Sequence, residues 1–176
     1  MRRHLWLLAC CSALLAAACG SDPSKPEEHH PKVPPGSKIG IIAFQDCAIT
    51  GQEDCEGSGL IAGSIFAVEL NDQQLVTVSL SRPVGPKEQL SDAAAVAYGK
   101  SQGLDYVLNG QVTDFYRVAP MTFRDERAGV AVHLLRVSDG QELYFHADRD
   151  TKNNLSSPEK ILRNIAGDVK DDIEDN

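Results

Sequence analysis

The sequence predicts an α+β fold, a mixed β-sheet of about five strands with helices packed on it, in the order β-α-β-α-β-β-β-α. Three observations lead to this prediction. Between residues 38 and 102, short apolar runs alternate with segments of helical periodicity. From residue 105 to 148, apolar residues recur at every second position, as in antiparallel strands. The chain then closes with an amphipathic helix, so we expect one sheet covered by helices.

The first three elements follow directly from their residue patterns. Residues 38–44, KIGIIAF, are apolar and β-branched on both faces, which predicts a buried central strand. Residues 58–71 carry apolar side chains at helical spacing and predict a helix. Residues 75–80, LVTVSL, predict a second strand, after which a proline-rich segment breaks the chain.

The second helix has clear boundaries. Ser91 or Asp92 is a good N-cap for a helix over residues 92–102, and Gly103 is a good stop. The period then changes to two in residues 105–118, which predicts a half-buried strand.

The C-terminal part predicts a hairpin and a closing helix. Residues 128–137 and 142–148 alternate as strands, and the Asp-Gly pair in 138–140 favours a tight turn between them. Ser157 and Pro158 are a typical helix start. We expect an apolar stripe to bury this helix against the sheet and its acidic end, residues 171–175, to fray. The stripe consists of Ile161, Ile165, Val169 and Ile173.

Residues 1–18 have the three parts of a secretory signal peptide. Arg2 and Arg3 form a positive start, an apolar run follows, and small alanines precede Cys19. The apolar run is shorter than the roughly 20 residues that span a membrane. The sequence therefore divides into a signal peptide (1–18), a lipidated Cys with a proline-rich tether (19–37) and one domain (38–176).

The border at Cys19 resembles the lipobox of bacterial lipoproteins, in which a peptidase cuts just before the cysteine. The chain departs from that pattern at Ala16, where the family usually has Leu. The resemblance implies that Cys19 is acylated and that the lipid holds the chain in the membrane. Because Gly20 rather than Asp follows the cysteine, it also implies the outer membrane, facing the periplasm. The alternative is an ordinary signal cut near Ala18, with Cys19 unmodified.

The tether is rich in proline, which favours extended polyproline II geometry over a helix. At about 3.1 Å per residue it reaches on the order of 50 Å from the membrane. His29 and His30 lie in this segment, and we interpret them as part of a solvated tether rather than as a metal site.

Composition excludes some classes of function. The formal charge of the chain is −8, and removal of the signal peptide with its two arginines makes it more negative. An acidic chain repels phosphate backbones, so we expect no nucleic-acid partner. We expect no enzyme activity, no catalytic residue, no cofactor and no metal.

Two motifs lie near the first helix. Residues 57–62, GSGLIA, match G-x-G-x-x-A but do not follow a strand directly, so we interpret Gly57 and Gly59 as permitting a tight helix start. Cys47 and Cys55 are close in one loop, and an oxidising periplasm favours a disulfide between them. The alternative is a redox pair, although the spacing is not C-x-x-C.

The loop over residues 45–57 follows the predicted central strand, where binding surfaces often form in such sheets. We predict that it contacts a protein partner. A second candidate is the loop over residues 118–127, with Met121 and Phe123. The predicted contact residues of the first loop are Gln45, Asp46, Ile49, Gln52, Glu53 and Asp54.

Two histidines offer a chemical alternative. His133 and His146 lie in the two strands of the predicted hairpin, at similar distances from its turn. If they come together, Asp148 or Asp150 is the nearest carboxylate to complete a metal or acid–base site. We favour the simpler interpretation of two sheet histidines with local hydrogen bonds.

The domain resembles periplasmic lipoproteins of the TolB amino-terminal-domain-like type. This group includes activators of penicillin-binding proteins and the curli-secretion lipoprotein. The resemblance covers roughly residues 38–170, but the chain lacks an evident membrane-inserting hairpin like that of the curli type. The residues that carry it are Ala97, Gly103, Leu104, Asp105, Val107, Gly110, Val112, Leu135, Val137, Asp139, Gly140 and Glu142.

The resemblance implies a lipid-anchored, non-catalytic adaptor or accessory subunit of an envelope machine for cell-wall synthesis, secretion or motility. Its partners would be outer-membrane lipid through Cys19 and another envelope protein. One alternative is a metal-dependent envelope hydrolase or a lipoprotein that binds a small ligand. The other is a subunit of an oligomeric secretion pore.

Overall fold

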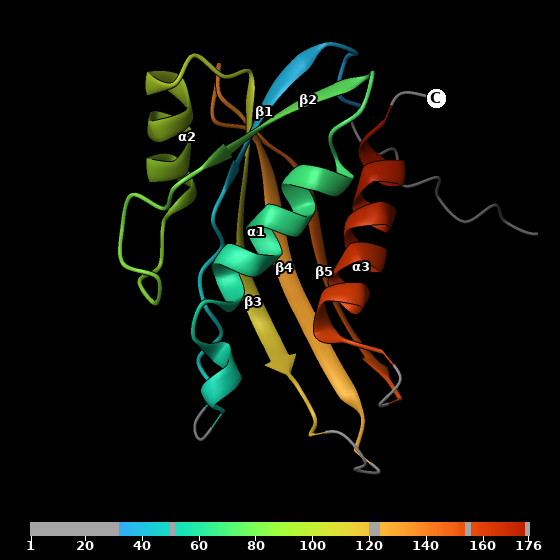
Figure 1. Ribbon diagram of the computed structural model, residues 1–176. Helices are drawn as coiled ribbons and strands as arrows, with labels where there is room; N and C mark the ends of the chain where they lie inside the picture. The colour runs from blue at the N-terminus through green and yellow to red at the C-terminus, as the bar shows by residue number, and fades with distance from the viewer. Residues whose placement is uncertain (1–31, 50–51, 120–123, 154–155, 175–176) are drawn as a thin grey trace, which may run out of the picture.

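A five-stranded mixed sheet runs through the domain in the order β2-β1-β3-β4-β5 (Figure 1). The computed structural model describes residues 32–49, 52–119, 124–153 and 156–174. The signal peptide, Cys19, most of the tether, Met121 and Phe123 lie outside these residues. In chain order, the elements are β1 (Ser37–Ile42), η1 (Glu53–Cys55), α1 (Ser58–Glu69), β2 (Leu75–Leu80), α2 (Asp92–Ser101), β3 (Tyr106–Tyr116), β4 (Glu126–Arg136), β5 (Glu142–Lys152) and α3 (Pro158–Ile173).

The predicted α+β class and element order are confirmed. β1 pairs in parallel with β2 and β3, whereas β3, β4 and β5 form an antiparallel meander. The main difference from the prediction is length, because β4 and β5 each extend further away from their shared turn than the alternating pattern indicated. Cross-strand pairing, which local periodicity does not report, continues to Lys152 opposite Glu126.

The helices cover both faces of the sheet. α1 and α3 contact each other and lie across the face that holds the main core (Figure 1). α2 packs on the opposite face over a smaller apolar cluster that includes Val107 and Leu135. The alternation of β3 explains the split, since Leu108 belongs to the main core while its neighbour Val107 lies under α2.

The glycines at the start of α1 have the predicted structural role. Gly57 is the N-cap in the left-handed region, with φ of 77°. A Cβ at Gly59 would collide with the backbone carbonyl of Phe44. At Gly63 it would crowd the backbone of Ala43. Glycine therefore lets α1 lie directly against the chain that leaves β1.

α3 is held at both ends. The Ser157 hydroxyl accepts a hydrogen bond from the Lys160 amide, as predicted for its cap. The predicted apolar stripe is buried along its whole length. The expected fraying is wrong for the described residues, because the helix continues to Ile173 and the buried Glu174 pairs with Val33 in a β-bridge.

Because Glu174 pairs with Val33, the folded part begins earlier in the chain than the predicted boundary at residue 38. Val33 is buried in the main core, and its amide donates to the Ile173 carbonyl at 2.9 Å. The Lys32 ammonium donates to the Glu174 carbonyl at 2.6 Å. The last residues of the predicted tether therefore pack on the domain, because they supply an apolar anchor and a cation for the acidic end of α3. Among the described residues, no helix combines the length and the apolar character needed to cross a membrane.

Candidate functional site

The predicted disulfide between Cys47 and Cys55 is present. Their Cα atoms are 5.0 Å apart, and both side chains are buried beside the start of α1. The Ser58 hydroxyl accepts from the Cys47 amide at 3.2 Å and donates to the Cys55 carbonyl at 2.7 Å. The bridge therefore fixes the loop over residues 45–57 against the helix that follows it.

Asp46 caps α1 from inside the domain. Its carboxylate accepts from the Gly57 amide at 2.9 Å and from the Gly59 amide at 2.7 Å. The residue is only 3% exposed. Asp46 was predicted to contact a partner, but its side chain is used within the fold and offers nothing to an external surface.

The other predicted contact residues of this loop are largely bound to the domain. The backbone of Gln45 forms a β-bridge to β3. The side-chain amide of Gln52 donates a hydrogen bond to the Phe115 carbonyl. The Asp54 carboxylate accepts from the Arg117 amide at 3.2 Å. Glu53 lies in η1. Of the predicted loop residues with a described side chain, Ile49 is the exposed one.

The predicted contact surfaces do not include the outer face of α1. Leu60 is 65% exposed and Val68 is 71% exposed, with the exposed Ser64 between them at a spacing of four residues. We call these three residues the α1 surface. Glu69 is the single charged residue in the helix, so the sequence pattern is apolar around most of its circumference. That missing polar face is the signal that predicts a surface to be covered.

A groove of about 440 Å³ lies beside Leu60. Arg82 lines this groove, and its guanidinium donates hydrogen bonds to the backbone carbonyls of Ala43 at 3.1 Å and Glu88 at 2.6 Å. Burial of the guanidinium lowers the pKa of Arg82. The groove thus extends the apolar α1 surface toward the loop over residues 45–57. Its apolar lining includes Ala43, Phe44, Leu60, Val84 and Pro86.

The two histidines of the hairpin lie on opposite faces of the sheet. His133 is opposite Phe145, whereas His146 is opposite Val132. The hypothesis that they come together is therefore wrong. A β-bulge between Leu134 and Leu135 shifts the register by one residue, and such a shift moves every following side chain to the other face.

The carboxylates near the two histidines are not the predicted Asp148 and Asp150. His146 contacts the Tyr144 hydroxyl at 3.0 Å, and that hydroxyl donates to Asp172 of α3 at 2.7 Å. Burial and this hydrogen bond raise the pKa of Tyr144. Asp150 instead pairs with Lys152, which lowers the pKa of its carboxyl.

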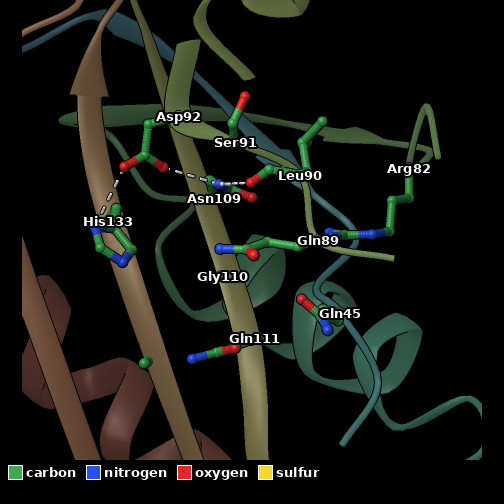
Figure 2. Close-up of a pocket in the computed structure, with 11 residues that line it drawn as sticks. Gln45, Arg82, Gln89, Leu90, Ser91, Asp92, Asn109, Gly110, Gln111 and His133 are labelled. Carbon is green, nitrogen blue, oxygen red and sulfur yellow. Dashed lines mark hydrogen bonds and ion pairs between the residues drawn. The ribbon is translucent and has the colours of Figure 1, made fainter. Parts of the chain in front are cut away.

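His133 has two carboxylates beside it. Its Nδ1 is 2.7 Å from Glu142 Oε2 and 3.7 Å from Asp92 Oδ2. Figure 2 shows Asp92 between His133 and Asn109, with an interaction to each. Asn109 is only 6% exposed and donates to Asp92 Oδ1 at 3.0 Å, so a buried amide orients this carboxylate.

A polar cavity of about 320 Å³ borders this cluster (Figure 2). Asp92, Asn109 and His133 belong to its wall, together with Arg82 and several glutamines. The cavity lies on the α2 side of the sheet, where β3 and β4 leave the cover of that helix. The glutamines are Gln45, Gln89 and Gln111.

Comparison with known proteins shows that the fold of this chain is similar to the folds of solved structures. No family model and no curated protein matches this chain. A PelC dodecamer from Paraburkholderia phytofirmans has a TM-score of 0.64 and 21% identity, over 84% of this chain and 94% of PelC. The lipoprotein GNA1162 from Neisseria meningitidis has a TM-score of 0.50 and 13% identity, over 77% of this chain and 96% of GNA1162. The chain therefore has a fold that a bacterial lipoprotein also has.

Proposed function

We propose that this chain is a lipid-anchored, non-catalytic accessory subunit of a cell-envelope assembly, and that it acts through protein contacts. Acylation of Cys19 would hold it at the outer membrane, facing the periplasm, and the tether would give its domain reach. A diacylglycerol on the Cys19 sulfur and an acyl chain on the new amino terminus would together give a stable anchor, since each buried CH₂ contributes about 0.8 kcal/mol and a single chain binds only marginally. The similarity of its fold to that of a bacterial lipoprotein supports this proposal.

The observation that carries the proposal is the α1 surface. A surface helix in a globular domain normally turns charged residues outward, which keeps the domain soluble. α1 instead turns Leu60 and Val68 outward, and Leu60 borders a mainly apolar groove whose lining also includes Glu56 and Arg82. Leu60 and the groove beside it form an exposed apolar surface, and such surfaces are typical of protein interfaces.

We propose a second copy of this chain as the occupant of the α1 surface. PelC has a similar fold over most of both chains and forms a dodecamer. Copies anchored in one membrane also meet at a high local concentration, which favours a contact too weak to form in dilute solution. A secretion pore would share this self-association and would additionally conduct across a bilayer.

Self-association of the full chain, purified in detergent, tests the proposal. We expect a defined oligomer in sedimentation velocity, and we expect Leu60→Asp and Val68→Asp to shift it to monomer because each places a charge in the contact. Ala97→Asp, on the exposed side of α2, is the matched control and should leave the oligomer intact. If the wild-type chain is monomeric, or if the charged α1 variants assemble normally, a second copy does not bind the α1 surface.

The same preparations test the anchor. Cells grown with a labelled fatty acid should yield labelled wild-type chain and unlabelled Cys19→Ser chain, and the variant should leave the membrane fraction. An unlabelled wild-type chain would refute the acylation of Cys19. It would not affect the proposal of self-association through the α1 surface.

A further inference from the structure

We propose that Asp92, His133 and Glu142 form a binding site for Zn²⁺. The ligating atoms of all three side chains lie within 4.8 Å of one another. They come from three separate elements, namely the start of α2, the middle of β4 and the start of β5. This site is independent of the proposed self-association, and it lies on the other side of the sheet from α1.

The distances from His133 to the two carboxylates fit a tetrahedral ion, and the two carboxylate oxygens lie within 4.8 Å of each other. Ligands bound at 2.0–2.1 Å in a tetrahedral site lie about 3.3 Å apart. The two distances from His133 Nδ1 are 2.7 Å to Glu142 and 3.7 Å to Asp92, on either side of that value. Both carboxylate side chains are more than 40% exposed, so adjustments of a few tenths of an ångström need only small rotations on the surface.

Two of the three ligands are held in position by neighbours. The buried Asn109 amide binds one oxygen of Asp92 and leaves the other facing His133. The His133 ring packs against the Phe145 ring, with centroids 4.8 Å apart. Outer contacts of this kind fix ligand orientation in metal sites, and their loss typically lowers metal affinity by about 10- to 100-fold.

The chemical types of the three ligating side chains favour Zn²⁺ over Ca²⁺ and Mg²⁺. One imidazole and two carboxylates match Zn²⁺, whereas Ca²⁺ and Mg²⁺ prefer oxygen ligands alone. Two negative charges neutralise the dication, and the acidic chain attracts cations generally. Zn²⁺ would bind the unprotonated Nδ1 of a neutral imidazole whose single proton is on Nε2, and any proton displaced from Nδ1 would pass to solvent. Three protein ligands leave a fourth position for water, as in open zinc sites.

Zinc binding to the full chain tests the proposal. After treatment with a chelator, the chain is dialysed against zinc sulfate, and bound metal is measured by mass spectrometry. We expect His133→Ala, Asp92→Asn and Glu142→Gln each to lose one equivalent of Zn²⁺, or at least tenfold in affinity. Comparing each variant with wild type cancels zinc held by other groups, such as His29 and His30.

His146→Ala is the matched control, because His146 lies on the opposite face of the sheet and should not affect zinc binding. Thermal unfolding in chelator should be similar for wild type and the ligand variants, which separates lost binding from lost folding. Zinc binding by His133→Ala equal to that of wild type would overturn the site. Displacement of Zn²⁺ by millimolar Ca²⁺ or Mg²⁺ would overturn the assignment of the metal.

Discussion

The carboxylate of Asp46 is a single buried group on which the start of α1 depends. The first amides of a helix have no partner within the helix, and a buried one must be satisfied by a side chain. Asp46 supplies both oxygens, to Gly57 and to Gly59, although it lies eleven residues or more before them. The conventional N-cap position is occupied by Gly57, which has no side chain to offer.

We therefore predict that Asp46→Ala lowers the free energy of unfolding by about 2–4 kcal/mol. The substitution leaves two amides at the start of α1 without their charged acceptor. Urea unfolding followed by circular dichroism measures the change. Glu56→Ala, at an exposed position of the same loop, should stay within about 0.5 kcal/mol of wild type. An Asp46→Ala chain of normal stability would show that this cap contributes nothing.

Among the elements, α1 and α3 differ in how closely they approach the rest of the domain. α1 touches the backbone that follows β1, and only glycine leaves room at Gly59. α3 packs through side chains, and a Cβ at Gly167 would meet nothing within 4 Å. The same substitution should therefore have opposite effects in the two helices.

We predict that Gly59→Ala destabilises the chain by more than about 2 kcal/mol, because the new methyl group collides with backbone that cannot rotate away. Gly167→Ala should stabilise it by about 0.5–1 kcal/mol by reducing the entropy of the unfolded chain. Urea midpoints of the two variants, measured side by side, check both signs. Equal stability of the two variants would contradict the close approach of α1.

Across the whole molecule, a charged cluster joins parts that are distant in sequence. Lys170 of α3 lies 2.7 Å from Asp72, before β2, and 3.5 Å from Glu174. The hydrogen bond from Lys170 lowers the pKa of Asp72 well below its usual range, with help from the Leu75 amide. The same hydrogen bond raises the pKa of Lys170, whereas burial raises the pKa of Glu174.

The depressed pKa of Asp72 makes this contribution dependent on pH. Asp72 stabilises the fold when ionised, so its contribution is complete above the unfolded pKa of about 3.9 and is lost as pH falls through the folded pKa. We predict that Asp72→Asn lowers stability by about 1 kcal/mol at pH 7, since the pair is partly exposed. The difference from wild type should shrink steadily below about pH 4.

Urea unfolding at several pH values measures this difference. Asn keeps an oxygen for the amides of Gln74 and Leu75, so the variant isolates the charge. Asp171→Asn, at an exposed position of the same helix, is the control. A wild-type advantage that stays constant from pH 7 to pH 2 would exclude the ion pair as its source.

Features that depend on neighbours along the chain could be predicted from the amino-acid sequence alone. Short apolar runs predicted β1 and β2, alternation predicted β3 to β5, helical spacing predicted the buried stripe of α3, and Ser157 marked its start. The disulfide was also predictable, because Cys47 and Cys55 are close in one loop. Each of these rests on local geometry, which residue type and spacing report directly.

Which side chains face one another across the sheet depends on the folded structure. One β-bulge placed His133 and His146 on opposite faces, while the pairing of Glu142 with Leu135 and the packing of α2 brought Glu142 and Asp92 beside His133. Likewise, only the fold shows that Asp46 is buried and that Leu60 is exposed. Register and burial depend on contacts between distant segments, and a shift of one residue reverses the face on which a side chain lies.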